Sequence, residues 1–295
     1  MHDALFFKYR IRETRIDPKK KYELQFNLTL KNNRLFKMTM RNHKKYGTSV
    51  NRQSSLINLG IVCPMANELD TAESFIKEVL EKCRSFEFNT IKFFVILDNA
   101  SKDGTVDLVQ QMSKEINEVI FIFAPENKCV VDAYIRGYRE ALSAKCDWIL
   151  EIDAGYSHQP NDILKFFETM IQGYDCVFGS RFCSGGRFSR GSVKRYIISR
   201  SGTILATLLL GTKLHDMTSG FELFTHDALQ EILKIGINSR GPFFQTEIKT
   251  YAHKFKITEV PILYQAPSHN ITGNVLKDAF SNLWRLFRLR LVNAI

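Results

Sequence analysis

Short runs of apolar residues alternate with amphipathic stretches along residues 57–179 of the chain. The apolar runs are nearly continuous, which is typical of strands buried on both faces of a parallel sheet. The amphipathic stretches repeat apolar residues every three or four positions, which predicts helices. The pattern predicts strands at 57–64, 91–98, 119–124, 148–153 and 175–179, and helices at 72–83, 105–112, 131–144 and 162–171. Repeated strand–helix units indicate an α/β fold, with a mostly parallel sheet and helices on both faces.

The first 57 residues differ from the remainder in charge. They hold 14 Lys and Arg against 4 Asp and Glu, whereas the remaining residues hold 27 of each, so the whole net charge of +10 belongs to this part. Alternation at 22–30 and a returning run at 35–40 predict a β-hairpin, followed by a basic linker. A basic patch suits nucleic acid or anionic lipid, but a solvated, partly flexible extension is the plainer interpretation. We do not expect a nucleic acid partner.

These patterns divide the chain of 295 residues into three parts. We expect a basic extension at 1–56, an α/β domain at 57–273 and an amphipathic helix at 274–295. Six cysteines are scattered without a C-x-x-C pair, so we expect free thiols in a reducing compartment and neither disulfides nor a zinc site. No signal peptide is visible, and no apolar stretch approaches the ~20 residues that span a bilayer. The composition therefore predicts a protein that is soluble or lies on a membrane surface.

Polar residues follow three of the predicted strands. Asp153 ends the run Trp148–Ile152, Asp98 ends the second strand, and the first strand continues into Pro64-Met65-Ala66-Asn67-Glu68. A single Asp at a strand end commonly caps a turn. Three such ends in one parallel sheet indicate a ligand site, because open α/β sheets bind ligands at the carboxyl ends of their strands. Asp98 is suited to accept a hydrogen bond from a ribose hydroxyl or a base.

Six motifs extend this pattern in a fixed order over about residues 57–290: IVCPMANE, LDNASKDGT, EIDAGYSHQP, DCVFGSRFCSGG, KRYIISRSG and HDMTSGFELF. Together they resemble inverting family-2 glycosyltransferases of the GT-A fold, in the branch of dolichol-phosphate mannosyltransferases and related polyprenyl-phosphate glycosyltransferases. The resemblance implies a GDP- or UDP-sugar as donor and a polyprenyl or dolichyl phosphate as acceptor. It also implies Mg²⁺ or Mn²⁺ at the donor diphosphate, where a hard cation neutralises the charge of the leaving group.

The resemblance also assigns roles to particular residues. The residues implied to bind the nucleotide sugar are Pro64, Ala66, Glu68, Asp98, Asn99 and Asp153. Asp153 would hold the metal, and Gln159 is a candidate to complete its coordination shell. Arg181 would be a second positive group beside the diphosphate, and it joins Asp153 as a catalytic candidate. A surface arginine paired with a carboxylate is the alternative for Arg181.

Two apolar helices are predicted on the acceptor side. In the helix at 192–210, Arg195 and Ser199 are four residues apart and share a face. In the resembled enzymes this pair meets the lipid phosphate, whereas an ordinary polar helix face is the alternative. The last helix has an apolar side and a basic side, which favours either a helix lying in a lipid headgroup layer or one packed on the domain. We expect a peripheral protein on the cytoplasmic face of a membrane.

One departure from the family pattern concerns the metal. Gly155 stands where the family has a second acidic ligand, which predicts a weakened metal site. Two other functions remain open. One is transfer to a glycan hydroxyl in surface-polysaccharide assembly, with Asp216 or Glu247 as the base that such an acceptor needs. The other is a non-catalytic partner that binds a nucleotide sugar.

Overall fold

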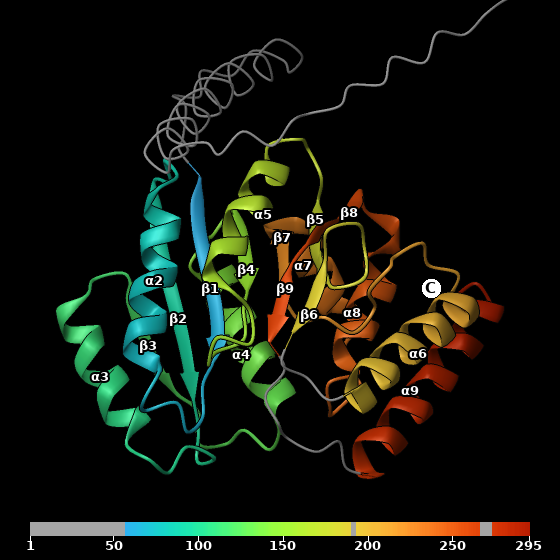
Figure 1. The fold of residues 1–295 in the computed structure, drawn as a ribbon, viewed down its shortest axis with the longest axis horizontal. Coiled ribbons are helices and arrows are strands. Elements are labelled where there is room, and N and C mark those ends of the chain that lie inside the picture. The colour runs from blue at the N-terminus through green and yellow to red at the C-terminus, as the bar shows by residue number, and fades with distance from the viewer. Residues whose placement is uncertain (1–56, 190–192, 266–272) are drawn as a thin grey trace, which may run out of the picture. The chain divides into compact units, whose positions relative to one another are not determined.

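The computed structural model describes residues 57–189, 193–265 and 273–295. Their centre is a seven-stranded sheet in the order β3-β2-β1-β4-β7-β5-β8 (Figure 1). The strands are β1 (Asn58–Pro64), β2 (Thr90–Leu97), β3 (Val119–Phe123), β4 (Trp148–Glu151), β5 (Cys176–Ser180), β7 (Glu222–Thr225) and β8 (Ile257–Pro261). β7 runs antiparallel to both β4 and β5, and the other neighbours pair in parallel.

Two apolar cores lie on the two faces of this sheet. One contains buried side chains of α2 (Ala72–Arg84), α3 (Thr105–Glu115) and α5 (Ile163–Met170). The other contains side chains of α4 (Val130–Ser143), α7 (His226–Ile235) and α8 (Phe244–Tyr251). Since alternate residues of a strand point to opposite faces, each central strand contributes to both cores, which explains its nearly continuous apolar run.

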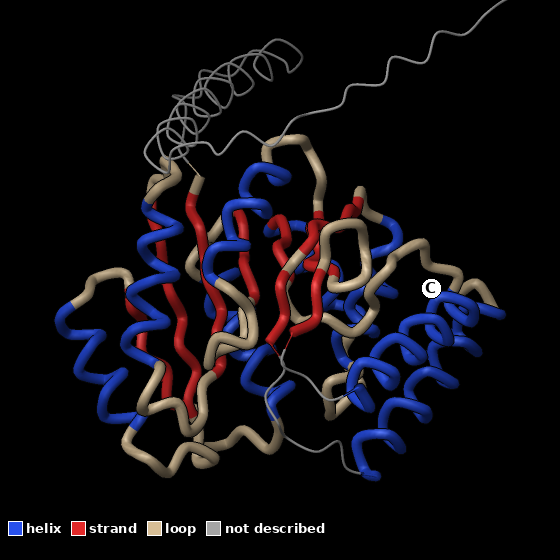
Figure 2. Tube along the Cα trace, in the orientation of Figure 1, coloured by secondary structure: helices blue, strands red, loops and turns tan. Residues whose placement is uncertain are grey.

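A second, smaller sheet and two long helices lie outside the seven-stranded sheet. β6 (Arg187–Ser189) pairs in parallel with β9 (Leu263–Gln265) as a separate two-stranded sheet. Two long helices, α6 (Val193–Leu210) and α9 (Gly273–Leu291), lie side by side at one end of the domain (Figures 1 and 2). The α9 side chains Leu283 and Leu286 join the core shared with α4, so α9 packs on the domain.

The predicted α/β fold, with a mostly parallel sheet and helices on both faces, is confirmed. Each of the five predicted strands and four predicted helices between residues 57 and 180 is present, with ends that differ by at most a few residues. On the basic side of α9, the Arg285 guanidinium donates to the buried Glu247 carboxylate, which adds a polar contact between this helix and the domain. The predicted extension at 1–56, with its hairpin and linker, lies outside the described residues.

Candidate active site

Asp153 lies just beyond the carboxyl end of β4, beside the end of β1. β2 and β3 follow β1 toward one edge of the sheet, whereas β4 and the later strands lie toward the other edge. Open α/β sheets bind ligands where the strand order reverses in this way. The Asp153 side chain is 36% exposed, and the Tyr134 hydroxyl on α4 donates a hydrogen bond to its Oδ1. The backbone N–H of Asp153 donates to His158 Nδ1 over 3.1 Å. Asp153 is therefore held at a fixed position while still facing solvent.

His158 supports this turn from inside the protein. Its side chain is fully buried, and its ring stacks on Phe221 with 4.9 Å between ring centroids. Burial lowers the pKa of the imidazole below its ordinary value, and Nδ1 already accepts the Asp153 N–H. His158 is therefore a neutral, packed side chain in this structure, and its role here is to orient the backbone of Asp153.

A pocket of about 220 Å³ opens at the carboxyl ends of β1 and β2. Three of the residues predicted to bind the nucleotide sugar line it, namely Pro64, Ala66 and Asp98. Asp98 Oδ1 accepts the backbone N–H of Ala100 over 2.8 Å, which fixes the start of the loop after β2. The other two predicted residues of these strand ends, Glu68 and Asn99, are not among its lining residues, and the Asn99 amide donates to the Pro125 carbonyl.

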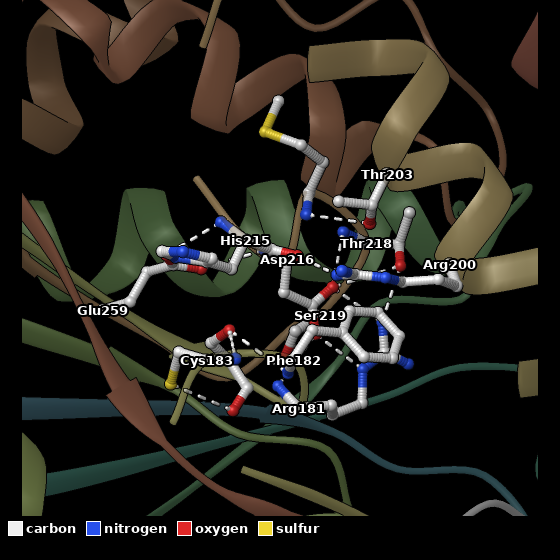
Figure 3. A network of polar contacts seen from close by, with 12 residues as sticks. Arg181, Phe182, Cys183, Arg200, Thr203, His215, Asp216, Thr218, Ser219 and Glu259 are labelled. Atoms are coloured by element: carbon white, nitrogen blue, oxygen red, sulfur yellow. Dashed lines mark hydrogen bonds and ion pairs between the residues drawn. The ribbon is translucent and has the colours of Figure 1, made fainter. Parts of the chain in front are cut away.

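Arg181 follows β5 and is held by Asp216 in a two-pronged ion pair (Figure 3). Its Nε and Nη2 donate to the two Asp216 carboxylate oxygens over 2.7 and 2.8 Å, and Nη2 also donates to Thr218 Oγ1 over 2.6 Å. Both side chains are almost completely buried, so the alternative of a surface arginine is wrong. Burial opposes ionisation of Asp216, but the adjacent guanidinium outweighs it and holds the pKa of Asp216 below its ordinary value.

The loop that carries Asp216 is itself anchored to the sheet. The Glu259 carboxylate on β8 accepts the backbone N–H groups of His215 and Asp216 over 2.8 and 2.9 Å. The Arg181 guanidinium also lies 5.1 to 5.7 Å from the ring centroids of Phe182, Phe188 and Tyr264. Arg181 is thus a rigid positive group whose orientation is set by several elements at once.

A cavity of about 640 Å³ joins Asp153 and Arg181 to the two long helices. Apolar side chains of α6 and α9 form much of its wall: Ile197, Ile198, Leu205, Val275, Leu276, Ala279, Phe280 and Leu283. Ser199 of α6 also lines it. Arg195 lies one turn earlier in the same helix, and its side chain lies outside the described part of the structure. The cavity therefore has a charged end at the sheet and an apolar end between the helices.

The Asp153 carboxylate suits a divalent cation that binds both to the protein and to the diphosphate of a donor. Within the described ranges, no cluster of three or more His, Cys, Asp or Glu side chains is arranged to hold a metal ion. Cations of this kind often bind through one or two carboxylates plus substrate phosphates, so a full cage of protein ligands is not needed. Gln159 is not a lining residue of the cavity, and its amide donates to the Tyr156 carbonyl over 2.6 Å. The Glu68 carboxylate lies directly against Gly155 instead.

Several polar residues at the site were not among the predicted site residues, although Glu151 and Glu222 lie within the motifs EIDAGYSHQP and HDMTSGFELF. Gln245 of α8 lines the cavity, and its amide donates to the buried Glu151 carboxylate on β4. Glu151 faces Glu222 across the β4–β7 pair, and the Lys249 ammonium donates to Glu222. Burial raises the pKa of Glu222 to about 7, although Lys249 opposes this. A further sequence signal for Glu151 was that it interrupts an otherwise apolar strand.

The fold and the site together define an enzyme class. A pocket at the β1 and β2 ends, a carboxylate after β4 and a second cavity at that carboxylate are the arrangement of a GT-A glycosyltransferase. Residues 60–233 match the sequence profile described as "Glycosyl transferase family 2", which covers more than half of the chain. The chain belongs to this family.

Two relatives and one solved structure illustrate the similarity. The chain is 30% identical over 196 residues to an undecaprenyl-phosphate mannosyltransferase of Micrococcus luteus, covering 65% of this chain and 80% of the relative. It is 24% identical over 207 residues to a polyprenol monophosphomannose synthase of Mycolicibacterium smegmatis, covering 69% and 76%. Glucosyl-3-phosphoglycerate synthase from Mycobacterium tuberculosis, solved with Mn²⁺, UDP-glucose and phosphoglyceric acid, shares the fold with a TM-score of 0.54 at 15% identity, over 78% of this chain and 80% of that one.

Proposed function

We propose that this glycosyltransferase moves a sugar, with inversion, from a GDP- or UDP-sugar to a polyprenyl or dolichyl phosphate. One observation carries the proposal: the cavity that contains Asp153 and Arg181 continues into a wall of apolar side chains from α6 and α9. A phosphate joined to a long isoprenoid chain has the matching combination of a charged end and an apolar end. The names of the two relatives, an undecaprenyl-phosphate mannosyltransferase and a polyprenol monophosphomannose synthase, support the same acceptor class.

The acidic residues around the cavity favour a phosphate over a hydroxyl as acceptor. A sugar hydroxyl needs a base, whereas a phosphate monoester is already ionised at neutral pH. Asp216 is ion-paired with Arg181, and Glu247 accepts hydrogen bonds from Arg285 and the N–H of Ser239. Among the described residues that line the cavity, Asp153 is the only Asp or Glu. Neither residue considered as a base for a glycan acceptor is therefore available.

Each group of the site has a role in this reaction. The pocket at Pro64, Ala66 and Asp98 would hold the nucleoside of the donor. A divalent cation held at Asp153 would neutralise charge on the diphosphate as it leaves. Arg181 keeps its Nη1 free of the Asp216 and Thr218 contacts, so it can donate to a phosphate oxygen in the cavity. Alignment of donor and acceptor and neutralisation of charge would then supply the catalysis.

Transfer assays with purified protein test the proposal. We expect transfer to a short-chain polyprenyl phosphate from at least one of GDP-mannose, GDP-glucose, UDP-glucose or UDP-N-acetylglucosamine, with dependence on Mn²⁺ or Mg²⁺. Transfer to a free glycan alone would instead establish the polysaccharide alternative. Binding of a nucleotide sugar without transfer to either acceptor would establish the non-catalytic alternative.

The acceptor phosphate is expected to meet Arg195 and Ser199. Ser199 lines the cavity, and Arg195 precedes it by one helical turn. A charge-assisted contact contributes roughly 1.5–3 kcal/mol, so Arg195→Ala should raise the KM for polyprenyl phosphate about tenfold to a hundredfold. Ser199→Ala should raise it less, because a neutral hydroxyl contributes less. Initial rates with each substrate varied in turn check this; a change confined to the donor KM would place Arg195 at the diphosphate.

We also propose that the α6–α9 end of the domain lies against an anionic lipid bilayer. Within the part of the chain that the structure describes, no helix is long and apolar enough to cross a membrane. Each of the two helices, however, exposes apolar side chains: Ile197, Ile204, Leu208, Leu276, Phe280, Trp284 and Leu291. Exposed Lys277 and Arg288 of α9 add positive charge. Ile197 and Phe280 also line the cavity, so its apolar end opens at this surface.

Replacing Leu208 and Trp284 with Gln should weaken vesicle binding at least tenfold. Both side chains are more than half exposed and do not line the cavity, and burial of each in lipid stabilises binding by about 1.5–3 kcal/mol. Co-sedimentation with vesicles containing anionic lipid measures this effect. Phe123→Gln, at an exposed position on the edge strand β3, is the matched control and should bind normally. Equal binding by all variants would contradict the proposed surface, and absence of vesicle binding by the wild-type protein would contradict a peripheral location on a membrane.

A further inference from the structure

We propose that Glu68 replaces the acidic side chain that is missing at Gly155 and serves, with Asp153, as a protein ligand of the donor's divalent cation. The inference rests on the proposed function, because it assumes a nucleoside diphosphate donor that binds together with a cation. It assigns to Glu68 a role different from contact with the nucleoside.

The positions of Glu68 and Gly155 carry this inference. A Cβ atom added at Gly155 would lie 2.7 Å from Glu68 Oε1 and 2.8 Å from Oε2, closer than real Cβ atoms approach oxygen. The Glu68 carboxylate therefore occupies the space into which a side chain at position 155 would project. Gly155 follows Asp153 by two residues, so this carboxylate lies beside the turn that carries the retained acidic residue.

The backbone of Glu68 is fixed independently of any ligand. Its N–H donates to Thr105 Oγ1 over 2.9 Å, and its carbonyl accepts the N–H groups of Thr71 and Ala72 at the start of α2. The Thr71 hydroxyl donates to Glu68 Oε2 over 2.6 Å. Within the described residues, the other carboxylate oxygen, Oε1, has no hydrogen-bond partner. One oxygen thus orients the group while the other remains available to a cation.

The turn after Asp153 is packed against the same helix. The Tyr156 ring meets the Phe75 ring of α2 edge-on, with 5.3 Å between centroids. Gly155 and Tyr156 both have positive φ values, 67° and 58°, so the chain reverses sharply at this point. This packing keeps the 153–156 turn close to the start of α2, where Glu68 lies, without a side chain at position 155.

The nucleoside pocket gives no competing role to Glu68. Glu68 lines neither this pocket nor the cavity that contains Asp153, and its carboxylate is placed instead by Thr71 and by the turn at Gly155. A carboxylate directed at the Asp153 turn, together with Asp153 and diphosphate oxygens, supplies the hard oxygen ligands that Mg²⁺ and Mn²⁺ prefer. Position 155 therefore does not lack a carboxylate; another segment of the chain provides it.

Glu68→Gln tests the assignment, because it removes the charge while it preserves size and the contact with Thr71. We expect Mn²⁺ affinity in the presence of GDP or UDP, measured by isothermal titration calorimetry, to fall at least tenfold. Nucleotide affinity in EDTA should remain unchanged. Glu73→Gln, at an exposed carboxylate of α2 paired with Lys77, is the matched control and should bind Mn²⁺ like the wild-type protein.

A double variant tests whether side chains at positions 68 and 155 occupy the same space. Glu68→Ala clears the space, and Gly155→Asp then returns a carboxylate from the other side, since Asp tolerates a positive φ better than most residues. We expect Mn²⁺ affinity to recover to within about threefold of the wild-type value, whereas Gly155→Asp alone should weaken Mn²⁺ binding by displacing Glu68. A folded double variant without recovery would overturn the inference.

The possible failures can be told apart. If the wild-type protein binds neither GDP nor UDP in the presence of Mn²⁺, the proposed donor class is wrong. If it binds one of them and Glu68→Gln binds Mn²⁺ equally well, only the assignment of Glu68 is overturned. Weaker nucleotide binding by Glu68→Gln in EDTA, with an unchanged Mn²⁺ affinity, would return Glu68 to the nucleoside site.

Discussion

Asp153→Asn is expected to reduce the rate of sugar transfer at least a hundredfold without unfolding the protein. The side chain lines the cavity, and its exposed position means that the amide fits the same space. Loss of a charge-neutralising contact in the transition state costs about 3 kcal/mol or more, which corresponds to this factor in rate. Initial rates at saturating donor and acceptor measure the effect, and a thermal melt checks the fold.

A carboxylate away from the cavity supplies the control for Asp153. Asp227→Asn removes an exposed charge from the first turn of α7, and it should leave the transfer rate unchanged. Turnover by Asp153→Asn close to that of the wild-type protein would exclude Asp153 from the mechanism. It would leave the fold assignment intact, because that rests on the sheet and on the family match.

Asp216→Asn is expected to destabilise the protein by about 3–5 kcal/mol. Removal of one partner from a buried ion pair leaves an uncompensated charge, here the Arg181 guanidinium, whose side chain is only 4% exposed. The backbone N–H of Arg181, which also donates to Asp216, would lose a charged acceptor. Urea denaturation measures the change in the free energy of unfolding.

The matched control for Asp216 is a surface ion pair. Glu231→Gln breaks the exposed contact with Lys234, and it should change the free energy of unfolding by no more than about 1 kcal/mol. Equal stability of Asp216→Asn and the wild-type protein would contradict the structure around Arg181. The rate of Asp216→Asn can also fall because part of the protein is unfolded. A rate loss much larger than this unfolded fraction would show that Arg181 also acts in the reaction.

The same pair predicts how stability depends on pH. The pKa of Asp216 is lower in the folded protein than in the unfolded chain, where a carboxyl group of this type titrates near 3.9. The stabilisation is therefore present above about pH 4, and it is lost as the pH falls through the lower folded-state pKa. Asp216→Asn should remove this part of the acid dependence.

The sequence by itself determined the order of the central elements and the acidic residues at their ends. Strand periodicity placed Asp98 and Asp153 after buried strands, and parallel topology then required these ends to lie at one edge of the sheet. Motif order identified Arg181, Arg195 and Ser199 as candidates. The predicted order of strands and helices is confirmed because it depends on local patterns and on a topology that allows few alternatives.

Only the tertiary structure decided which distant residues meet. β7 inserts antiparallel between β4 and β5, which brings Glu222 opposite Glu151. Asp216, considered as a base, proved to be the partner of Arg181, since a buried guanidinium requires a carboxylate. Neither contact has a local sequence pattern, because each joins residues far apart in the chain.

Gly155 shows the same division most clearly. From the sequence, the glycine meant one lost carboxylate and a weakened metal site. In the structure, Glu68 comes from a segment more than eighty residues earlier in the chain and fills the space beside Gly155. The sequence motif shows which side chain is absent at position 155. Only the packing of separate segments determines which other side chain occupies the space beside it.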